Sequence, residues 1–144
     1  MASTPQFSNL INTAGALVST ANTNADGTGT IVDVVTMRTA ASGGQGGRVD
    51  AIIAQATGVT TAGMLRIYRK SAAAAYRLIR EINVSAVAAP GATTKRWTIP
   101  TTEGADANGV LQFAGGITLA PGEALGVSTH NGEAFHVTAF AGEF

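Results

Sequence analysis

The segment Asn22–Asp33, NTNADGTGTIVD, comes close to a calcium-binding loop. In that loop residues 1, 3 and 5 offer oxygen ligands, residue 6 is a glycine that bends the chain, and residue 12 is a bidentate glutamate. Asn22, Asn24, Asp26, Gly27 and Asp33 fall on these places, but Asn22 lacks the charge of aspartate and Asp33 is one methylene shorter than glutamate. The flanking residues are rich in Gly, Thr and Val, and Asp-Gly before a β-branched run also opens a strand. We therefore expect a turn here, and no metal site.

Few other residues could support acid–base or nucleophilic chemistry. The chain has no cysteine and two histidines, His130 and His136, which point to opposite faces in the register we expect. Ser128, His130 and Glu133 share one face, but a triad is defined by its geometry and pocket, so we interpret them as a polar turn. Nothing marks Glu123 and Glu133 as a glycosidase pair. The sequence therefore predicts a protein that is not an enzyme and has no cofactor.

Two segments could bind anions. Residues 42–48, SGGQGGR, lack the spacing of a phosphate-binding loop and precede a predicted strand, so we expect a flexible loop. The second segment is a basic cluster with two interleaved tyrosines. Zero net charge and an acidic second half disfavour a nucleic-acid binder, so docking on an acidic protein partner is the expected use. The cluster contains Arg66, Tyr68, Arg69, Lys70, Tyr76, Arg77 and Arg80.

The composition predicts one domain with an adhesive surface. The 144 residues include only 12% charged residues against 45% hydrophobic ones, whereas soluble domains carry about 25% charged residues. Such a surface is poorly protected against association, so we expect it to be covered. The chain has no apolar run long enough for a membrane span, and MASTPQFSNL lacks the basic region of a signal peptide, so we expect a cytosolic origin.

Charge is distributed unevenly along the chain. Through Arg96 there are nine basic and four acidic residues, and from Trp97 onward there are five acidic residues and no basic one. Two outcomes are open. The halves either neutralise each other within one molecule, or the basic edge of one subunit meets the acidic edge of the next.

Hydrophobic alternation and turn residues predict an all-β antiparallel sandwich, with a jelly roll as the expected arrangement. A helical stripe across residues 65–82 leaves a helix as the alternative to two strands there, although the period of two favours strands. The predicted strands are Thr30–Arg38, Arg48–Gln55, Met64–Lys70, Ala75–Val84, Lys95–Thr101, Val110–Leu119, Glu123–His130 and Glu133–Phe140.

Asn131-Gly132 predicts a tight hairpin between the last two strands, because this pair supplies the two positive-φ positions of a type I′ turn. In that register both faces of the hairpin are partly apolar. We therefore expect the outer face to be covered by a loop, an arm or another subunit. Trp97, which alternates with Ile99, is expected in the core rather than as an exposed binding platform.

Residues 1–26 are rich in Ser, Thr, Asn and Ala and too polar for a core of their own. They form either a disordered tail or an arm that orders on a neighbour's surface. We divide the chain into this N-terminal arm, 1–26, and a β-sandwich domain, 27–144.

Four segments resemble a family of small virion structural proteins of tailed bacteriophages and prophages. They are TANTNADGTGTIV, RVDAIIAQATGVTTAGMLRIYR, YRLIREINV and LAPGEALGVSTHNGEAFHVTAFAGEF, and the likeness spans roughly residues 20–144. The similarity lies in short sequence segments and in their order along the chain, and it includes no catalytic residues. The Ala-rich loop KSAAAAY departs from the turn chemistry expected of the family.

The resemblance implies a non-enzymatic head decoration, or cement, protein on the virion exterior, made in the host cytoplasm. It would bind the major capsid protein and itself, with a trimer favoured, and neither a membrane nor nucleic acid. A tail or baseplate component and a carbohydrate-binding module are the alternatives. The candidate partner-binding residues are Phe7, Leu10, Ile11, Leu17, Val18, Arg66, Arg69, Lys70, Arg77, Phe140 and Phe144.

Overall fold

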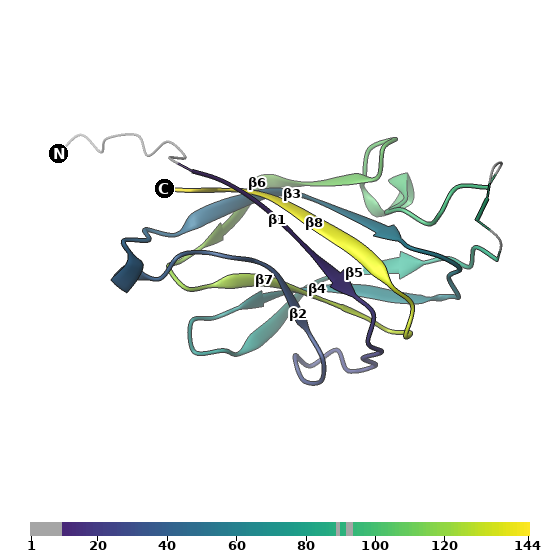
Figure 1. Cartoon of the computed structure of the whole chain (residues 1–144), viewed down its shortest axis with the longest axis horizontal. Helices are drawn as coiled ribbons and strands as arrows, with labels where there is room; N and C mark the ends of the chain where they lie inside the picture. Colours follow the sequence, from purple (N-terminus) through teal and green to yellow (C-terminus); the bar gives the residue numbers. More distant parts are fainter. Residues whose placement is uncertain (1–9, 89, 92–93) are drawn as a thin grey trace.

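The computed structural model describes residues 10–88, 90–91 and 94–144, which form two four-stranded antiparallel sheets packed against each other (Figure 1). The first sheet has the strand order β1-β8-β3-β6, and the second has the order β2-β7-β4-β5. The strands are β1 Leu10–Val18, β2 Val32–Thr36, β3 Gly47–Ala56, β4 Gly63–Lys70, β5 Tyr76–Val84, β6 Val110–Leu119, β7 Ala124–Thr129 and β8 Phe135–Glu143, with short 3-10 turns at Ala40–Ser42 and Thr101–Glu103. The predicted antiparallel β-sandwich is confirmed.

The strand pairs are nested. β1 pairs with β8, β2 with β7, β3 with β6 and β4 with β5, and the pairs β3–β8 and β4–β7 complete the two sheets. Every connection except that between β4 and β5 therefore passes from one sheet to the other. The topology is that of one long hairpin folded into two layers.

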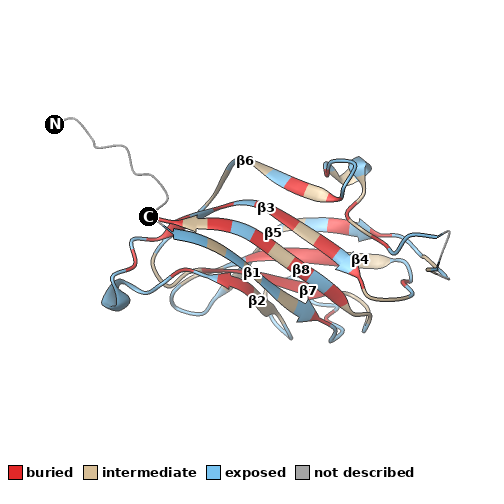
Figure 2. Ribbon diagram, turned by 45° about the horizontal axis from the view of Figure 1, so that its top comes forward, coloured by how far each residue is buried: buried red, intermediate tan, exposed pale blue. Residues whose placement is uncertain are grey.

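Alternation along the strands places the core between the sheets. On β8, Phe135, Val137 and Ala139 are buried, whereas the intervening His136 is exposed (Figure 2). Trp97 packs edge-on against Phe135 with ring centroids 5.4 Å apart, a contact that contributes about 1 kcal/mol beyond the area it buries. Trp97 is thus a core residue, as expected.

Seven of the eight predicted strands lie where the alternation placed them. The segment Lys95–Thr101 was predicted wrongly, because its pairing is limited to an isolated bridge between Gln55 and Thr98, and Pro100 offers no N–H to extend it. In the 64–84 segment two strands form and the helix alternative is wrong. Here the turn Ser71–Ala75 carries one non-glycine residue with positive φ, Ala74 at 66°.

The predicted β7–β8 hairpin is wrong, because these strands belong to different sheets. Phe135 pairs with Val18 on one side and with Ala56 on the other, so β8 gains two neighbours. Asn131 instead bonds across to the β3–β4 connection, where its Nδ2 donates to Thr61 Oγ1 at 2.9 Å. Burial of β8 between two long strands outweighs the local preference of Asn-Gly for a two-residue turn.

The predicted arm is also wrong for residues 10–18, which form β1 and pair with β8 over their full length without a register shift. Val18 is buried in the core, and the half-buried Ala14 and Ala16 pack against it. Small side chains on alternate positions suffice here, because β8 supplies the backbone partners. The boundary at residue 26 therefore falls inside the sandwich, and Phe7 lies outside the described residues.

Candidate functional site

The connection between β1 and β2, residues 19–31, covers the outer face of the second sheet. Its backbone carbonyls accept hydrogen bonds from two side chains of β4: Arg66 Nη1 donates to Asn22 O at 3.1 Å, and Tyr68 OH donates to Asn24 O at 3.1 Å. A bridge between Ala21 and Thr129 anchors the start of this covering loop. Arg66 and Tyr68 are buried as a result, and for this sheet the expected cover of the outer face is confirmed.

The covering loop is held by the same side chains that imitate a calcium loop. Asn22 Nδ2 donates to Thr28 O at 2.9 Å and to Thr30 O at 3.0 Å, and Asp26 Oδ1 accepts from Thr28 N at 3.0 Å. The Thr28 hydroxyl and N–H together lower the pKa of Asp26 below its ordinary value. With Gly27 at a φ of 88°, the turn interpretation is confirmed.

Asp33, which would be the twelfth ligand, is engaged elsewhere on β2. Its carboxylate accepts from Lys70 Nζ at 2.6 Å and from Tyr76 OH at 2.8 Å. Hydrogen bonding to Asp33 raises the pKa of Lys70. No group of three or more His, Cys, Asp or Glu side chains that could hold a metal occurs among the described residues.

The basic cluster is largely neutralised by acidic neighbours. Arg66 Nε pairs with Glu81 at 2.8 Å and is buried, so the expectation that Arg66 contacts a partner is wrong. Lys70 pairs with Asp33, as described above, and the exposed Arg69 pairs with Glu123 at 2.5 Å. Arg77 is exposed and has no acidic partner within the described part of the chain.

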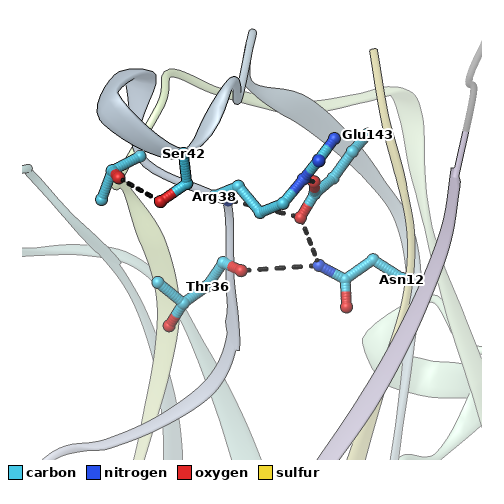
Figure 3. A network of polar contacts seen from close by, with 6 residues as sticks. Asn12, Thr36, Arg38, Ser42 and Glu143 are labelled. Atoms are coloured by element: carbon cyan, nitrogen blue, oxygen red, sulfur yellow. Dashed lines mark hydrogen bonds and ion pairs between the residues drawn. The ribbon is translucent and has the colours of Figure 1, made fainter.

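A polar network joins the start of β1 and the end of β8, which lie side by side in the first sheet, to the connection after β2 (Figure 3). Glu143 accepts from Arg38 Nε at 2.5 Å and from Asn12 Nδ2 at 2.8 Å. Burial alone would raise the pKa of Glu143, but the hydrogen bonds from Arg38 and Asn12 outweigh it and hold the pKa below its ordinary value. Together with the Arg69–Glu123 pair, the Arg38–Glu143 pair joins the basic half of the sequence to the acidic half within one molecule.

Ser128, His130 and Glu133 do not assemble into a catalytic group. Ser128 is buried and its Oγ lies 3.4 Å from Tyr68 OH, and Glu133 Oε1 accepts from Thr61 N at 2.6 Å. Within the described part of the chain, no hydrogen bond joins any two of these three side chains. Hollows of about 200, 420 and 400 Å³ occur on the surface. The first is lined by both Ser71 and Glu123, but Ser71 Oγ accepts from Ala75 N and Glu123 is engaged by Arg69.

Among the residues that the structure describes, none forms a loop over the outer face of the first sheet of the kind seen on the second. Ile11 and Leu17 of β1 are 89% and 51% exposed, and Phe140 of the neighbouring β8 is 38% exposed (Figure 2). The positions between them on β1 and β8 carry no charge. We call the set Ile11, Thr13, Gly15, Leu17, His136, Thr138 and Phe140 the bare face.

Of the predicted partner-binding residues, the structure therefore brings Ile11, Leu17 and Phe140 together on one surface. Leu10 is exposed where β1 begins, Phe144 is half-buried, and Val18 is buried in the core, so its expected contact with a partner is wrong. Sequence reasoning missed that Ile11, Leu17 and Phe140 share a sheet face. The alternation of Ile11, Thr13, Gly15 and Leu17 with Asn12, Ala14 and Ala16 was the available signal.

No family model, curated protein or solved structure matches the chain. Nor do the described residues form a helix long and apolar enough to cross a membrane. The assignment of function therefore depends on the geometry of the surface and on the resemblance in sequence.

Proposed function

We propose that this protein is a non-enzymatic structural protein of a phage virion that binds the assembled capsid lattice through its bare face. The observation that carries the proposal is the contrast between the two sheets. The second sheet buries its outer residues under the protein's own loop, whereas the first leaves Ile11, Leu17 and Phe140 in solvent. An exposed uncharged patch of this kind is typical of a surface that a partner covers.

The fold and the charge pattern agree with this proposal. Nested pairs of eight strands favour a jelly roll, an arrangement found in capsid and lectin domains. Most acidic and basic groups of the second sheet are engaged with one another, so strong charge complementarity with a partner is not the expected mode of binding. The resemblance to small phage virion proteins supplies the partner, the major capsid protein.

Binding of this kind stabilises a shell by mass action. A ligand that binds the assembled lattice and not its dissociated subunits adds about 2.7 kcal/mol per site when its free concentration is one hundred times its dissociation constant. Because a shell offers many equivalent sites, modest affinity at each site suffices. No chemistry at the site is required, in keeping with a protein that is not an enzyme.

The test is binding of the purified protein to expanded, empty capsids, measured by co-sedimentation and by the melting temperature of the capsids. We expect saturable binding and a higher melting temperature. Phe140→Asp places a charge on the bare face and is expected to weaken binding at least tenfold. Ile79→Asp, at an exposed isoleucine of β5 in the other sheet, is the matched control and is expected to bind normally.

Equal binding by the two variants would contradict a role for the bare face, and localisation of the protein to tails alone would favour the tail or baseplate alternative. A carbohydrate-binding role requires exposed aromatic rings. Trp97 and Tyr68 are buried, and Tyr76 is engaged with Asp33. Saturable sugar binding in a glycan screen would nevertheless replace the lattice proposal.

A further inference from the structure

The sandwich has four edge strands, and three of them carry features that hinder pairing with another strand. β2 has five residues, a register shift and the charged Asp33. β5 carries charges at Arg77 and Glu81 and a register shift against β4. β6 is interrupted opposite Asp50, because Val49 of β3 pairs with Ile117 whereas Ala51 pairs with Gln112. Short length, charge and bulges are the usual means by which proteins protect sheet edges.

β1 has none of these features. Its nine residues, LINTAGALV, include no charge and no proline, and its pairing with β8 runs without a shift. Because β1 is the last strand of its sheet among the described residues, no described strand pairs with its second edge. From Ile11 to Val18 no backbone group on that side has a hydrogen bond within the described part of the chain. This edge therefore offers a regular row of donors and acceptors.

The sequence of β1 is complementary to itself when two copies run antiparallel. Leu10–Val18 is centred on Ala14, so the register with complete overlap places Ala14 opposite Ala14 of the second copy. The same register places Ile11 opposite Leu17, and symmetry repeats this contact on the other side of the axis. Apolar pairs directly opposite each other stabilise antiparallel strands, and about eight backbone hydrogen bonds would accompany them.

We propose that two copies of this chain associate about a two-fold axis by antiparallel pairing of β1 with β1. The occupant of the edge is a second copy because the overlap, the apolar contacts and the absence of like charges are all satisfied by the strand's own sequence. A symmetric interface of this type uses the same residues on both subunits. The dimer joins two four-stranded sheets into one continuous sheet of eight strands.

The two-fold axis runs perpendicular to the sheet, so the bare faces of both copies point in the same direction. At about 4.8 Å per strand the joined sheet is about 38 Å wide, against about 19 Å for the sheet of one copy, and the two bare faces lie next to each other at its centre. The dimer does not depend on the lattice-binding proposal, because its evidence is the edge rather than the face. It differs from the trimer that the resemblance implies, and a measured mass distinguishes the two.

The first experiment measures mass and register together. The wild-type chain is expected to give twice the 14.5 kDa of one chain in light scattering. The chain has no cysteine, so Ala14→Cys introduces one thiol at the axis, where paired Cα atoms lie about 4.5–5.5 Å apart and a disulfide forms readily. Leu17→Cys is the control, because two such residues lie about 20 Å apart in this register.

We expect mild oxidation to convert Ala14→Cys, and not Leu17→Cys, to a covalent dimer on a non-reducing gel. Equal cross-linking of the two variants would overturn the register. A trimeric mass, or a monomeric mass at high micromolar concentration, would overturn the dimer. Either result leaves binding to capsids to be judged on its own measurement.

The second experiment introduces charges at the positions that face each other across the axis. Ile11→Lys combined with Leu17→Lys sets like charges opposite each other twice and is expected to raise the dissociation constant at least tenfold. Ile11→Lys combined with Leu17→Glu sets opposite charges in the same places and is expected to restore dimerisation. Ile79→Lys on β5 is the control for an added exposed lysine and should leave the mass unchanged. Similar dissociation constants for the two double variants would contradict the proposed pairing.

Discussion

Glu143→Gln tests whether the network in Figure 3 holds the edge of the first sheet in place. The Glu143 side chain is 5% exposed and accepts hydrogen bonds from Asn12 and Arg38. Glutamine keeps one acceptor oxygen but replaces the other with an N–H₂ group that faces the Arg38 guanidinium. A charge-assisted hydrogen bond is worth about 1.5–3 kcal/mol, and because Arg38 is 42% exposed we expect a loss of about 1–2 kcal/mol.

The same reasoning fixes how the loss depends on pH. The pKa of Glu143 is lower in the folded protein than the ordinary value of 4.5. The charged carboxylate therefore stabilises the fold fully above about pH 4.5, and this contribution disappears as the pH falls through the lowered pKa. The difference in unfolding free energy between the wild type and Glu143→Gln should thus be constant near neutrality and vanish in acid.

Urea unfolding followed by circular dichroism, at pH 7 and again near pH 3, measures both quantities. Asp50→Asn is the control, since its ion pair with Arg48 at 2.6 Å is about half exposed on both sides and should contribute less than about 0.5 kcal/mol. The reasoning is refuted if Glu143→Gln equals the wild type at pH 7, or if its deficit persists unchanged in acid.

Three further substitutions follow from the backbone and the core, each measured by urea unfolding. Ala74→Gly relieves a positive φ of 66° and should raise the free energy of unfolding by about 0.5–1 kcal/mol. Its control, Ala73→Gly in the same turn, should lower the free energy of unfolding by about as much. Gly27→Ala places a Cβ against the Tyr76 carbonyl oxygen of β5 and should lower the free energy of unfolding by about 2–4 kcal/mol. Its control is Gly43→Ala, whose added Cβ meets nothing within 4 Å and which should lower the free energy of unfolding by about 1 kcal/mol. Trp97→Phe removes a buried N–H that has no partner among the described residues, so the loss in unfolding free energy should stay under about 1.5 kcal/mol despite the smaller ring. A larger loss would indicate that the indole N–H has an acceptor.

The sequence specifies most strands because their signals are local. The alternation in β3 and in β4 predicts buried and exposed positions within a few residues, and the turn residues mark where each strand ends. The nested order of the strands is a different kind of property. It depends on pairs such as Leu10 with Glu143, which lie at opposite ends of the chain and leave no mark in any short window.

Two of the three wrong predictions about elements, the β7–β8 hairpin and the arm over residues 10–18, have this origin. Asn131-Gly132 carries the strongest local signal for a hairpin, yet β8 is buried between β1 and β3 and cannot also pair with β7. Residues 12–16 of β1 carry only small or polar side chains, yet an edge strand needs little more than a long partner and small inward residues. In both cases a non-local pairing decides the outcome.

The ion pairs also divide into one that local sequence could predict and others that depend on non-local pairing. Arg66 lies directly opposite Glu81 in the β4–β5 hairpin, so a sequence that predicts the hairpin could also have predicted that ion pair. The pairs Arg38–Glu143 and Arg69–Glu123 join distant segments and could not be predicted. They favour neutralisation within one molecule over an interface between oppositely charged edges.

Low surface charge has two different structural solutions in this molecule. In the second sheet the charges of the outer face pair with one another under residues 19–31, and the edge strands are shortened or charged, so this sheet needs no partner. In the first sheet the bare face and the β1 edge carry no charge and are not covered by any of the described residues. Phe140 lies on β8, one strand away from the edge, so a charge placed there should weaken binding to a shell and leave the dimer intact. If Phe140→Asp instead dissociates the dimer, the subunits meet face to face, and pairing through β1 is wrong.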